Sequence, residues 1–383
     1  MSNHLQLQQI TGQRDLDRFI DVPWQLYRDD PNWRPPLKLM EKERLTPAAN
    51  PYFEHAETAF WLALRDGVPV GRISAQIDHL ALQQPDHRHC GHFGFIEAID
   101  EAEVWQTLLT QAERWLKDKG MKRIMGPFNL SINQECGVLV KGFDHPPNLM
   151  MGHALPYYAG QLEAAGYAKI KDLIAYNLDV TRPFPSPIQK LLRRARRLDA
   201  LVVRPVNLKR FDDDMRLMFD IFNDAWADNW GFVPWTEAEI QQTAKEMKPL
   251  IRPEINWIAE YQGEPIGFMA ALPNLNEAIA DLDGRLLPFG WAKLLWRLKL
   301  RGRLTATNRV PLMGIRKRFQ GRPLGAYAAF LLIETIRHNG TAIGAQTAEL
   351  SWMLEDNTAL QDILEGIHAD PYKKYRLYSK SLS

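Results

Sequence analysis

The chain has 383 residues, of which 45% are hydrophobic and 24% are charged, a composition typical of a folded globular protein with two or three domains. Lysine and arginine together number 47, and aspartate and glutamate 46, so no field of one sign surrounds the molecule and a dedicated nucleic-acid binder is disfavoured. The two cysteines exclude a disulfide framework and a cysteine-rich zinc site.

Residues 1–19 contain no apolar stretch of the kind found in secretory signals. No apolar run in the sequence reaches the length of a transmembrane helix. The sequence therefore predicts a cytoplasmic protein and leaves open a peripheral contact with the inner membrane surface.

Two segments, 59–75 and 255–271, share apolar and turn residues at a constant offset of 196. Each predicts a strand, a tight turn at an Asp-Gly or Gln-Gly dipeptide, and a second strand. Two unrelated hairpins with the same turn chemistry are the alternative to an internal repeat. The matching pairs are Trp61 and Trp257, Ala63 and Ala259, Gly67 and Gly263, Pro69 and Pro265, Gly71 and Gly267, and Ala75 and Ala271.

The elements after each hairpin also repeat, so both halves predict the order β–α–α–β–β–β–α–β–α–β. Each half continues with an amphipathic helix, at 101–120 or 324–340, followed by a strand, a short helix and a closing strand. We expect these later elements at 122–130, 156–166 and 169–180 in the first half, and at 346–354, 357–366 and 373–380 in the second.

Four polar residues of the first half follow one another at period two. On a strand they would face the same side, which predicts one wall of a substrate pocket; an exposed strand edge is the alternative. The four residues are Asn129, Ser131, Asn133 and Glu135.

The segment 181–200 carries three prolines in its first half and predicts a linker between domains at 1–180 and 201–383. The basic run at 190–197 is interpreted as a solvated helix face.

The second half is longer than the first by about 24 residues, which coincide with an insertion at 281–305. Between positions 285 and 303 there are six basic residues and no acidic one. Trp291, Leu294, Leu295 and Leu298 share one helical face, a pattern typical of an interfacial membrane helix. A helix packed over the active site is the alternative, and either role makes Trp291 a candidate for substrate binding.

The segment 310–337 predicts a strand, a Gln-Gly-Arg-Pro-Leu-Gly loop at 320–325, and a helix. A loop ending in glycine brings backbone N–H groups close to a pyrophosphate, and the helix N-terminus adds positive charge. This combination, with the segments after it, resembles the GNAT N-acetyltransferase superfamily, whose loop reads Q/R-x-x-G-x-G/A. Pro323 departs from the family pattern, and a proline removes one N–H donor.

The resemblance implies that acetyl-CoA or a longer acyl-CoA donates an acyl group to an amine, without a metal. It places the thioester against the main chain near Met313, Gly314 and Ile315, where an N–H would stabilise the oxyanion. Asn357 matches the asparagine that opens a helix beside the coenzyme. The remaining residues expected to bind coenzyme are Arg318, Gln320, Gly321, Arg322, Leu324 and Gly325, with Arg316 and Lys317 as further cations.

Glu349 and Glu135 are the candidate bases for the amine. The tyrosine that often serves as acid in this family is absent, with Leu364 in its region, so Tyr375, Tyr372 or a water could supply the proton. His55 and His153 are weaker candidates.

The first half resembles a second GNAT copy without the phosphate loop, because no glycine-rich turn precedes its helix. Acidic residues stand where cations would be needed and would repel a pyrophosphate. These residues are Glu97, Asp100, Glu101 and Glu103.

The motifs at 126–137, 142–147 and 156–158, with 30–37 and 50–56, are similar to a group of large tandem GNAT-like bacterial proteins. Some of that group are associated with ceramide synthesis, which implies a long-chain sphingoid amine as acceptor. Tyr157 and Trp352 are further candidates for binding this substrate. A non-catalytic sensor of acyl-CoA or lipid, and an aminoacyl transferase that uses tRNA, stay as alternatives.

No metal site is expected. His87, His89, His92 and Cys90 lie close together in sequence, but their polar segment lacks the paired spacing typical of zinc ligands.

Overall fold

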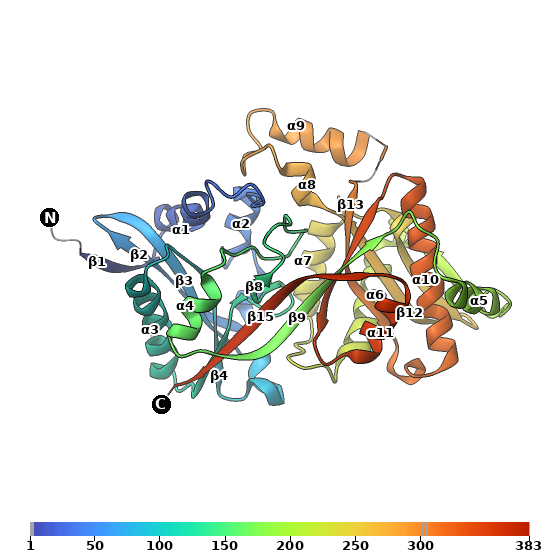
Figure 1. The fold of residues 1–383 in the computed structure, drawn as a ribbon, viewed down its shortest axis with the longest axis horizontal. Coiled ribbons are helices and arrows are strands. Elements are labelled where there is room, and N and C mark those ends of the chain that lie inside the picture. Colours follow the sequence, from blue (N-terminus) through green and yellow to red (C-terminus); the bar gives the residue numbers. More distant parts are fainter. Residues whose placement is uncertain (1–3, 301, 304, 383) are drawn as a thin grey trace. The chain divides into compact units, whose positions relative to one another are not determined.

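The computed structural model describes residues 4–300, 302–303 and 305–382, in a mixed α/β fold (Figure 1). The chain forms two compact units. Unit 1 comprises Met1–Leu173, Ile279–Leu286 and Lys373–Ser383, and unit 2 comprises Ile174–Ala278 and Leu287–Tyr372. Each unit is built on its own part of a mixed sheet, with helices on both faces.

The sheet of unit 1 runs in the order β1-β2-β3-β4-β5-β15, in which β4 and β5 pair in parallel. Gly71 of β3 lies against Leu108 of α3, while the next residue, Arg72, donates to the Phe19 carbonyl of α1. Since neighbouring strand residues point to opposite faces, α3 and α1 cover opposite faces. The strands are β1 (Leu5–Gln9), β2 (Ala56–Arg65), β3 (Val68–Asp78), β4 (Cys90–Ala98), β5 (Arg123–Gly126) and β15 (Asp370–Ser381); the helices are α1 (Gln13–Leu26), α2 (Lys38–Arg44), α3 (Ala102–Asp118) and α4 (Tyr158–Ala164).

Unit 2 repeats this plan in the order β9-β14-β13-β12-β11-β10. Phe268 of β12 lies with Ile221 of α6 around Gly314, whereas Met269 joins the core under α10, so α6 and α10 cover opposite faces. The strands are β9 (Ala168–Asp179), β10 (Leu201–Pro205), β11 (Asn256–Tyr261), β12 (Glu264–Pro273), β13 (Thr307–Ile315) and β14 (Thr347–Leu354); the helices are α5 (Ser186–Ala195), α6 (Phe211–Trp226), α7 (Glu237–Met247), α8 (Leu275–Ile279), α9 (Gly290–Leu295), α10 (Pro323–Ala342) and α11 (Thr358–Gly366).

The predicted repeat is confirmed in detail. Leu5 of β1 pairs with Arg65, and Leu201 of β10 pairs with Tyr261, at the same offset of 196 in both strands. Both hairpin turns place two successive residues at positive φ, 50° and 80° in the first and 53° and 80° in the second. Such a pair matches the twist of a two-residue hairpin, which explains the glycine at the second turn position.

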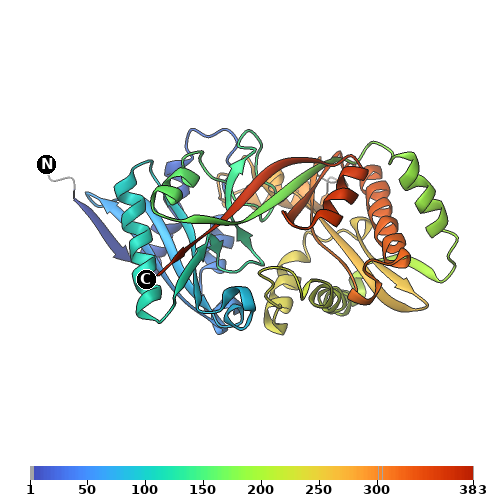
Figure 2. The same cartoon turned by 60° about the horizontal axis from the view of Figure 1, so that its bottom comes forward.

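The units exchange their closing strands. β9 ends the first half of the sequence, but from Ile174 onward it belongs to unit 2, and β15 ends the second half, but from Lys373 onward it belongs to unit 1. Figure 2 shows β9 in green and β15 in red, each passing from one unit into the other. A division at one linker, as expected from 181–200, does not describe this exchange.

The predicted linker contains the helix α5, which packs on α10. Leu192 and Ala195 are buried, whereas the arginines of the basic run are exposed. The interpretation of this run as a solvated helix face is confirmed.

The expectation of one strand carrying Asn129, Ser131, Asn133 and Glu135 is wrong. Only β6 (Phe128–Asn129) and β7 (Glu135–Cys136) are strands here, and the residues between them turn the chain back. Leu130 has a φ of 80°, which a continuous strand cannot accommodate. A short strand, β8 (Val138–Lys141), follows and pairs with β15.

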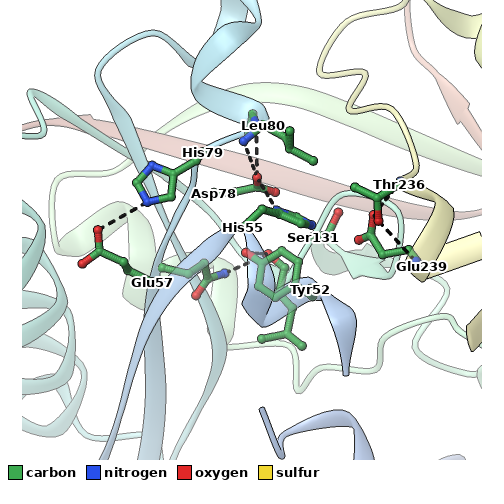
Figure 3. A network of polar contacts seen from close by, with 12 residues as sticks. Tyr52, His55, Glu57, Asp78, His79, Leu80, Ser131, Thr236 and Glu239 are labelled. Carbon is green, nitrogen blue, oxygen red and sulfur yellow. Dashed lines mark hydrogen bonds and ion pairs between the residues drawn. The ribbon is translucent and has the colours of Figure 1, made fainter. Parts of the chain in front are cut away.

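Side-chain hydrogen bonds stabilise the ends of a helix and of a strand, one in each unit (Figure 3). In unit 2, Thr236 and Glu239 form a reciprocal capping box at the start of α7. In unit 1, Asp78 accepts N–H groups from Leu80 and Ala81 at 2.9 and 3.1 Å, which ends β3 in a turn. Among the described residues, no helix has the length and apolar character needed to cross a membrane.

Candidate functional site

The strands β13 and β14 separate in the middle of the unit 2 sheet. They pair in parallel over residues 307–310 and 347–350. Within the described residues, the parallel register ends there, and β13 continues to Ile315 and β14 to Leu354. Parallel neighbours that diverge expose main-chain N–H and C=O groups at the point of separation. This point lies beside the helix α10 and its preceding loop, which follow β13 directly.

Glu349 lies at the end of the paired segment of β14 and is only 2% exposed. Its register partner on β13 is Arg309, whose Nε lies 3.9 Å from Glu349 Oε1. The hydroxyls of Ser351 and Tyr372 both donate to the Glu349 carboxylate. A buried carboxylate needs such partners, and Glu349 is therefore not an exposed residue of the strand.

The main chain after the separation is held from two sides. Trp226 donates from its indole Nε1 to the Met313 carbonyl at 3.0 Å, and Gln320 donates to the Ile315 carbonyl at 2.8 Å. Gly314 is buried, and an added Cβ would lie 3.1 Å from Phe268. These contacts fix the segment that the GNAT resemblance assigns to the thioester.

The loop before α10 depends on two glycines. Gly321 has a φ of 67°, and a Cβ on Gly325 would lie 2.1 Å from the Phe319 carbonyl oxygen. Glycine is therefore required at 325 because the backbone of the preceding turn occupies the space. Pro323 is the first residue of α10, a position whose N–H has no partner within the helix, so proline fits there without loss of a helical hydrogen bond.

Carboxylates hold most of the cations of this loop. Arg316 pairs with Asp220 of α6 at 2.6 Å, Lys317 with Asp228, and Arg318 with Glu264. The Lys317 N–H also donates to Asp224 at 2.8 Å. A coenzyme phosphate would compete with these acids. Arg322 is exposed and forms no ion pair within the described residues.

Asn357 is the N-cap of α11, and its Oδ1 accepts the Leu360 N–H at 3.2 Å. This places it at the helix opening that the resemblance implies. Leu364 is a buried core residue of the same helix, so α11 offers no hydroxyl at that position.

The equivalent position of unit 1 is occupied by the chain itself. Phe95 lies three residues after His92, the last β4 residue paired with β5, as Met313 lies three residues after Val310. The Asn129 Oδ1 accepts the Phe95 N–H at 2.7 Å, and a Cβ on Gly94 would lie 1.9 Å from the Phe128 carbonyl oxygen. Residues 128–129 therefore lie against β4 at the point where β4 no longer pairs with β5.

Asn129 and Glu135 belong to an ionic cluster around Arg44. Arg44 donates to the Asn129 carbonyl at 2.8 Å and lies 3.4 Å from Glu135 Oε2. Burial raises the pKa of Glu135, but Arg44 and the Asn129 amide outweigh burial and hold the pKa below its usual value. A carboxylate with a lowered pKa is a weak base, which argues against Glu135 as the base.

Replacing Asn129 by alanine is expected to lower the free energy of unfolding by about 1–3 kcal/mol, since the Phe95 N–H and the Arg44 cluster each lose a partner. Acyl-CoA affinity is expected to stay unchanged, because Asn129 lies in unit 1. Urea unfolding and titration calorimetry measure the two quantities. Weaker acyl-CoA binding by a folded variant would place a donor site in unit 1.

The other candidate residues lie in separate places. Ser131 is buried and accepts the Asn133 N–H at 3.1 Å within its turn. Tyr157 donates to the Ala98 carbonyl at 2.7 Å, so its hydroxyl stabilises the end of β4. Tyr375 is fully buried in unit 1, Trp352 is half-buried on β14, and Trp291 is 54% exposed on α9.

The histidines have partners in unit 1. The His55 Nδ1 lies 3.2 Å from Asp78 Oδ1 (Figure 3), and the His153 Nε2 lies 2.7 Å from Asp30 Oδ2. The His87 Nδ1 lies 2.8 Å from the His92 Nε2, and burial lowers the pKa of His92 to about 3. Within the part of the chain that the structure describes, no group of three His, Cys, Asp or Glu residues could hold a metal ion.

Sequence reasoning missed the residues that surround the candidates. Ser351 lies two residues after Glu349, so the strand pattern could have placed both on one face. Asp220, Asp224 and Asp228 follow one another at helical spacing. Arg44 carried no local signal, because its partners Asn129 and Glu135 lie far away in sequence.

Comparison with known proteins identifies close relatives, although no family model matches the chain. The chain is 47% identical over 369 residues to the bacterial ceramide synthase of Caulobacter vibrioides (strain NA1000 / CB15N), which covers 96% of this chain and 95% of that protein. It is 46% identical over 372 residues to Protein YghO of Escherichia coli (strain K12), with 97% and 94% covered.

Solved structures show the fold. A tandem GNAT protein from the clavulanic acid biosynthesis pathway matches with a TM-score of 0.55 at 11% identity, covering 99% of both chains. A GCN5-related N-acetyltransferase from Sphaerobacter thermophilus matches with a TM-score of 0.52 at 11% identity, covering 98% of this chain and 96% of the other. The predicted fold class, two tandem GNAT-like domains, is confirmed. With the 47% identity to the Caulobacter protein over nearly the whole length, the chain belongs to the bacterial ceramide synthase family.

Proposed function

We propose that this acyltransferase moves an acyl group from a CoA thioester to the primary amine of a long-chain, sphingoid-type lipid. The observation that carries the proposal is the separation of β13 and β14, with the buried Glu349 at its start and the glycine loop of α10 at its end. The name of the Caulobacter relative supports a lipid amine as acceptor.

The donor would bind along β13 and the loop before α10. The backbone N–H groups of Gly321, Leu324 and Gly325 and the N-terminus of α10 suit the pyrophosphate. The exposed Arg322 suits a further phosphate. The thioester carbonyl would lie against residues 313–315, where a main-chain N–H stabilises the negative oxygen formed during attack.

Glu349 is proposed as the base. The amine nitrogen attacks the thioester carbon, its proton passes to Glu349, and the C–S bond breaks to release the CoA thiolate. Tyr372 donates to the same carboxylate, which makes it the better placed of the two tyrosines to return the proton to the thiolate, because Tyr375 belongs to unit 1.

A product assay with two donors and two acceptors tests this proposal. Palmitoyl-CoA with a long-chain sphingoid amine is expected to give one amide, detected by mass spectrometry, for each CoA thiol released. Acetyl-CoA or a short water-soluble amine is expected to react at least about tenfold more slowly. Amide formation with the short amine alone would contradict the lipid acceptor, and binding of thioester without any release of CoA would support the non-catalytic alternative.

A further inference from the structure

The insertion of unit 2 exposes an unusual cluster of large apolar side chains. Six of the twelve most exposed large apolar residues of the described chain lie within positions 287–300. Single exposed apolar residues are normal on a soluble protein, but a contiguous group marks a surface that binds something. The six are Leu287 at 79%, Phe289 at 74%, Trp291 at 54%, Leu295 at 48%, Trp296 at 54% and Leu300 at 70% exposed.

Polar contacts, and not these apolar side chains, hold the segment in place. Arg297 donates to the Ala278 carbonyl at 2.6 Å. Glu277 accepts the N–H groups of Ala306 and Thr307, each at 3.0 Å. These contacts fix the turn Trp296–Leu300 and the chain that follows the insertion, while the six apolar side chains remain largely exposed.

The segment before the apolar cluster is anchored as well. Within unit 1, Trp24 donates to Asp283 at 2.9 Å, and the Lys38 N–H donates to the Gly284 carbonyl at 3.0 Å. Gly284 has a φ of 73°, and an added Cβ would lie 2.6 Å from the Trp24 ring. The chain therefore leaves a fixed turn immediately before it exposes Leu287, which argues against a loosely packed loop.

The charge around the cluster is positive. Arg285, Lys293 and Arg303 are exposed, and no acidic residue occurs between positions 285 and 303. Apolar and aromatic side chains mixed with cations suit the boundary between the headgroups and acyl chains of an anionic membrane, where aromatic rings insert and cations pair with phosphate. A protein partner or a second copy of the chain would need acidic residues opposite these cations. The charge pattern gives no reason to prefer such a partner over an anionic membrane.

We propose that residues 287–300 and 302–303 form a docking surface for an anionic lipid membrane. α9 (orange in Figure 1) and Trp296–Leu300 supply the inserted side chains, and the flanking cations supply attraction to acidic headgroups. This inference does not rest on the proposed acyl transfer, because membrane binding is measured without either substrate.

Co-sedimentation with vesicles tests the proposal. We expect the full chain to bind vesicles of phosphatidylcholine with about 30% phosphatidylglycerol at least about tenfold more tightly than vesicles of phosphatidylcholine alone. Raising the salt from about 0.05 to about 0.5 M is expected to weaken this binding severalfold, since screening shortens the reach of the cations.

The variant Phe289→Asp/Trp296→Asp is expected to lose at least about tenfold in affinity for the anionic vesicles. Leu198→Asp/Leu208→Asp is the matched control, because both leucines are exposed apolar residues of unit 2 outside the insertion. The melting temperature shows whether each variant is folded.

Equal vesicle binding by the wild type and a folded Phe289→Asp/Trp296→Asp variant would overturn the proposal. The same loss in the leucine control would also overturn it, because binding would then follow general surface polarity. Ultracentrifugation without vesicles provides the third check: a dimer that the variant dissociates, together with no preference for anionic lipid, would assign the surface to a second copy of the chain.

Discussion

Replacing Glu349 by glutamine is expected to lower kcat by about 10²–10⁴-fold, because the amide cannot take the proton of the attacking amine. The amide has the shape of the carboxylate: its oxygen can still accept one of the hydroxyl hydrogen bonds of Ser351 and Tyr372, and its NH₂ group can donate to the other hydroxyl. Acyl-CoA affinity is therefore expected to stay within about twofold, since the loss falls on the chemical step. Steady-state release of CoA and calorimetric titration measure the two effects.

Glu135→Gln is the matched control, with the same chemical change in unit 1. Arg44 holds the pKa of Glu135 low, so we expect kcat to fall by less than about tenfold if this carboxylate only stabilises unit 1. A large loss of kcat in Glu135→Gln, with full activity in Glu349→Gln, would exchange the roles of the two carboxylates. Loss of acyl-CoA binding in Glu349→Gln would show that the residue holds the donor rather than the proton.

Replacing Gly325 by alanine or aspartate is expected to weaken acyl-CoA binding by at least about 100-fold. The new Cβ would lie 2.1 Å from the Phe319 carbonyl oxygen, so the loop must move and its N–H groups lose their positions around the pyrophosphate. Aspartate adds a negative charge beside the phosphates. Titration calorimetry with acyl-CoA measures the loss.

Gly366→Ala provides the matched control, because an added Cβ at the end of α11 meets nothing within 4 Å. This variant is expected to bind acyl-CoA like the wild type. Since Gly325→Ala could unfold unit 2, Arg322→Glu gives a second test: Arg322 is exposed, so the fold should stay intact while affinity falls about tenfold. Normal binding by both loop variants would remove the donor from this loop.

The repeat of the fold could be predicted because its signals are local. Turn glycines, helix periodicity and apolar strands are read from neighbouring residues, and the hairpins at 59–75 and 255–271 fold as their shared positions indicate. The strand, loop and helix at 310–337 are likewise present, as β13, a turn and α10.

The rest depends on contacts between distant residues. The exchange of β9 and β15 could not be predicted, because the pattern of a strand does not name its neighbour. The period-two residues Asn129 to Glu135 are not on one strand, because a turn at 130–134 interrupts them and Asn129 bonds to Phe95. The domain boundaries that the sequence predicts on either side of 181–200 remain a prediction.

The acidic residues around the loop before α10 could also not be predicted from the loop motif. Asp220, Asp228 and Glu264 pair with the loop cations, but two of them lie on or just after α6, a long way before the loop in sequence. The motif contains only the cations. Their ion pairs with the acids form because α6 and β12 pack beside β13 in the fold.

Titration calorimetry with palmitoyl-CoA, below its micelle concentration, and with acetyl-CoA tests most directly whether unit 2 binds a long-chain thioester. We expect palmitoyl-CoA to bind at one site per chain and at least about tenfold more tightly than acetyl-CoA, because the longer acyl chain buries more apolar surface. Gly325→Asp is expected to abolish both heats. Binding of neither thioester to the wild-type chain, or equal binding by Gly325→Asp, would contradict a donor site at the loop of α10.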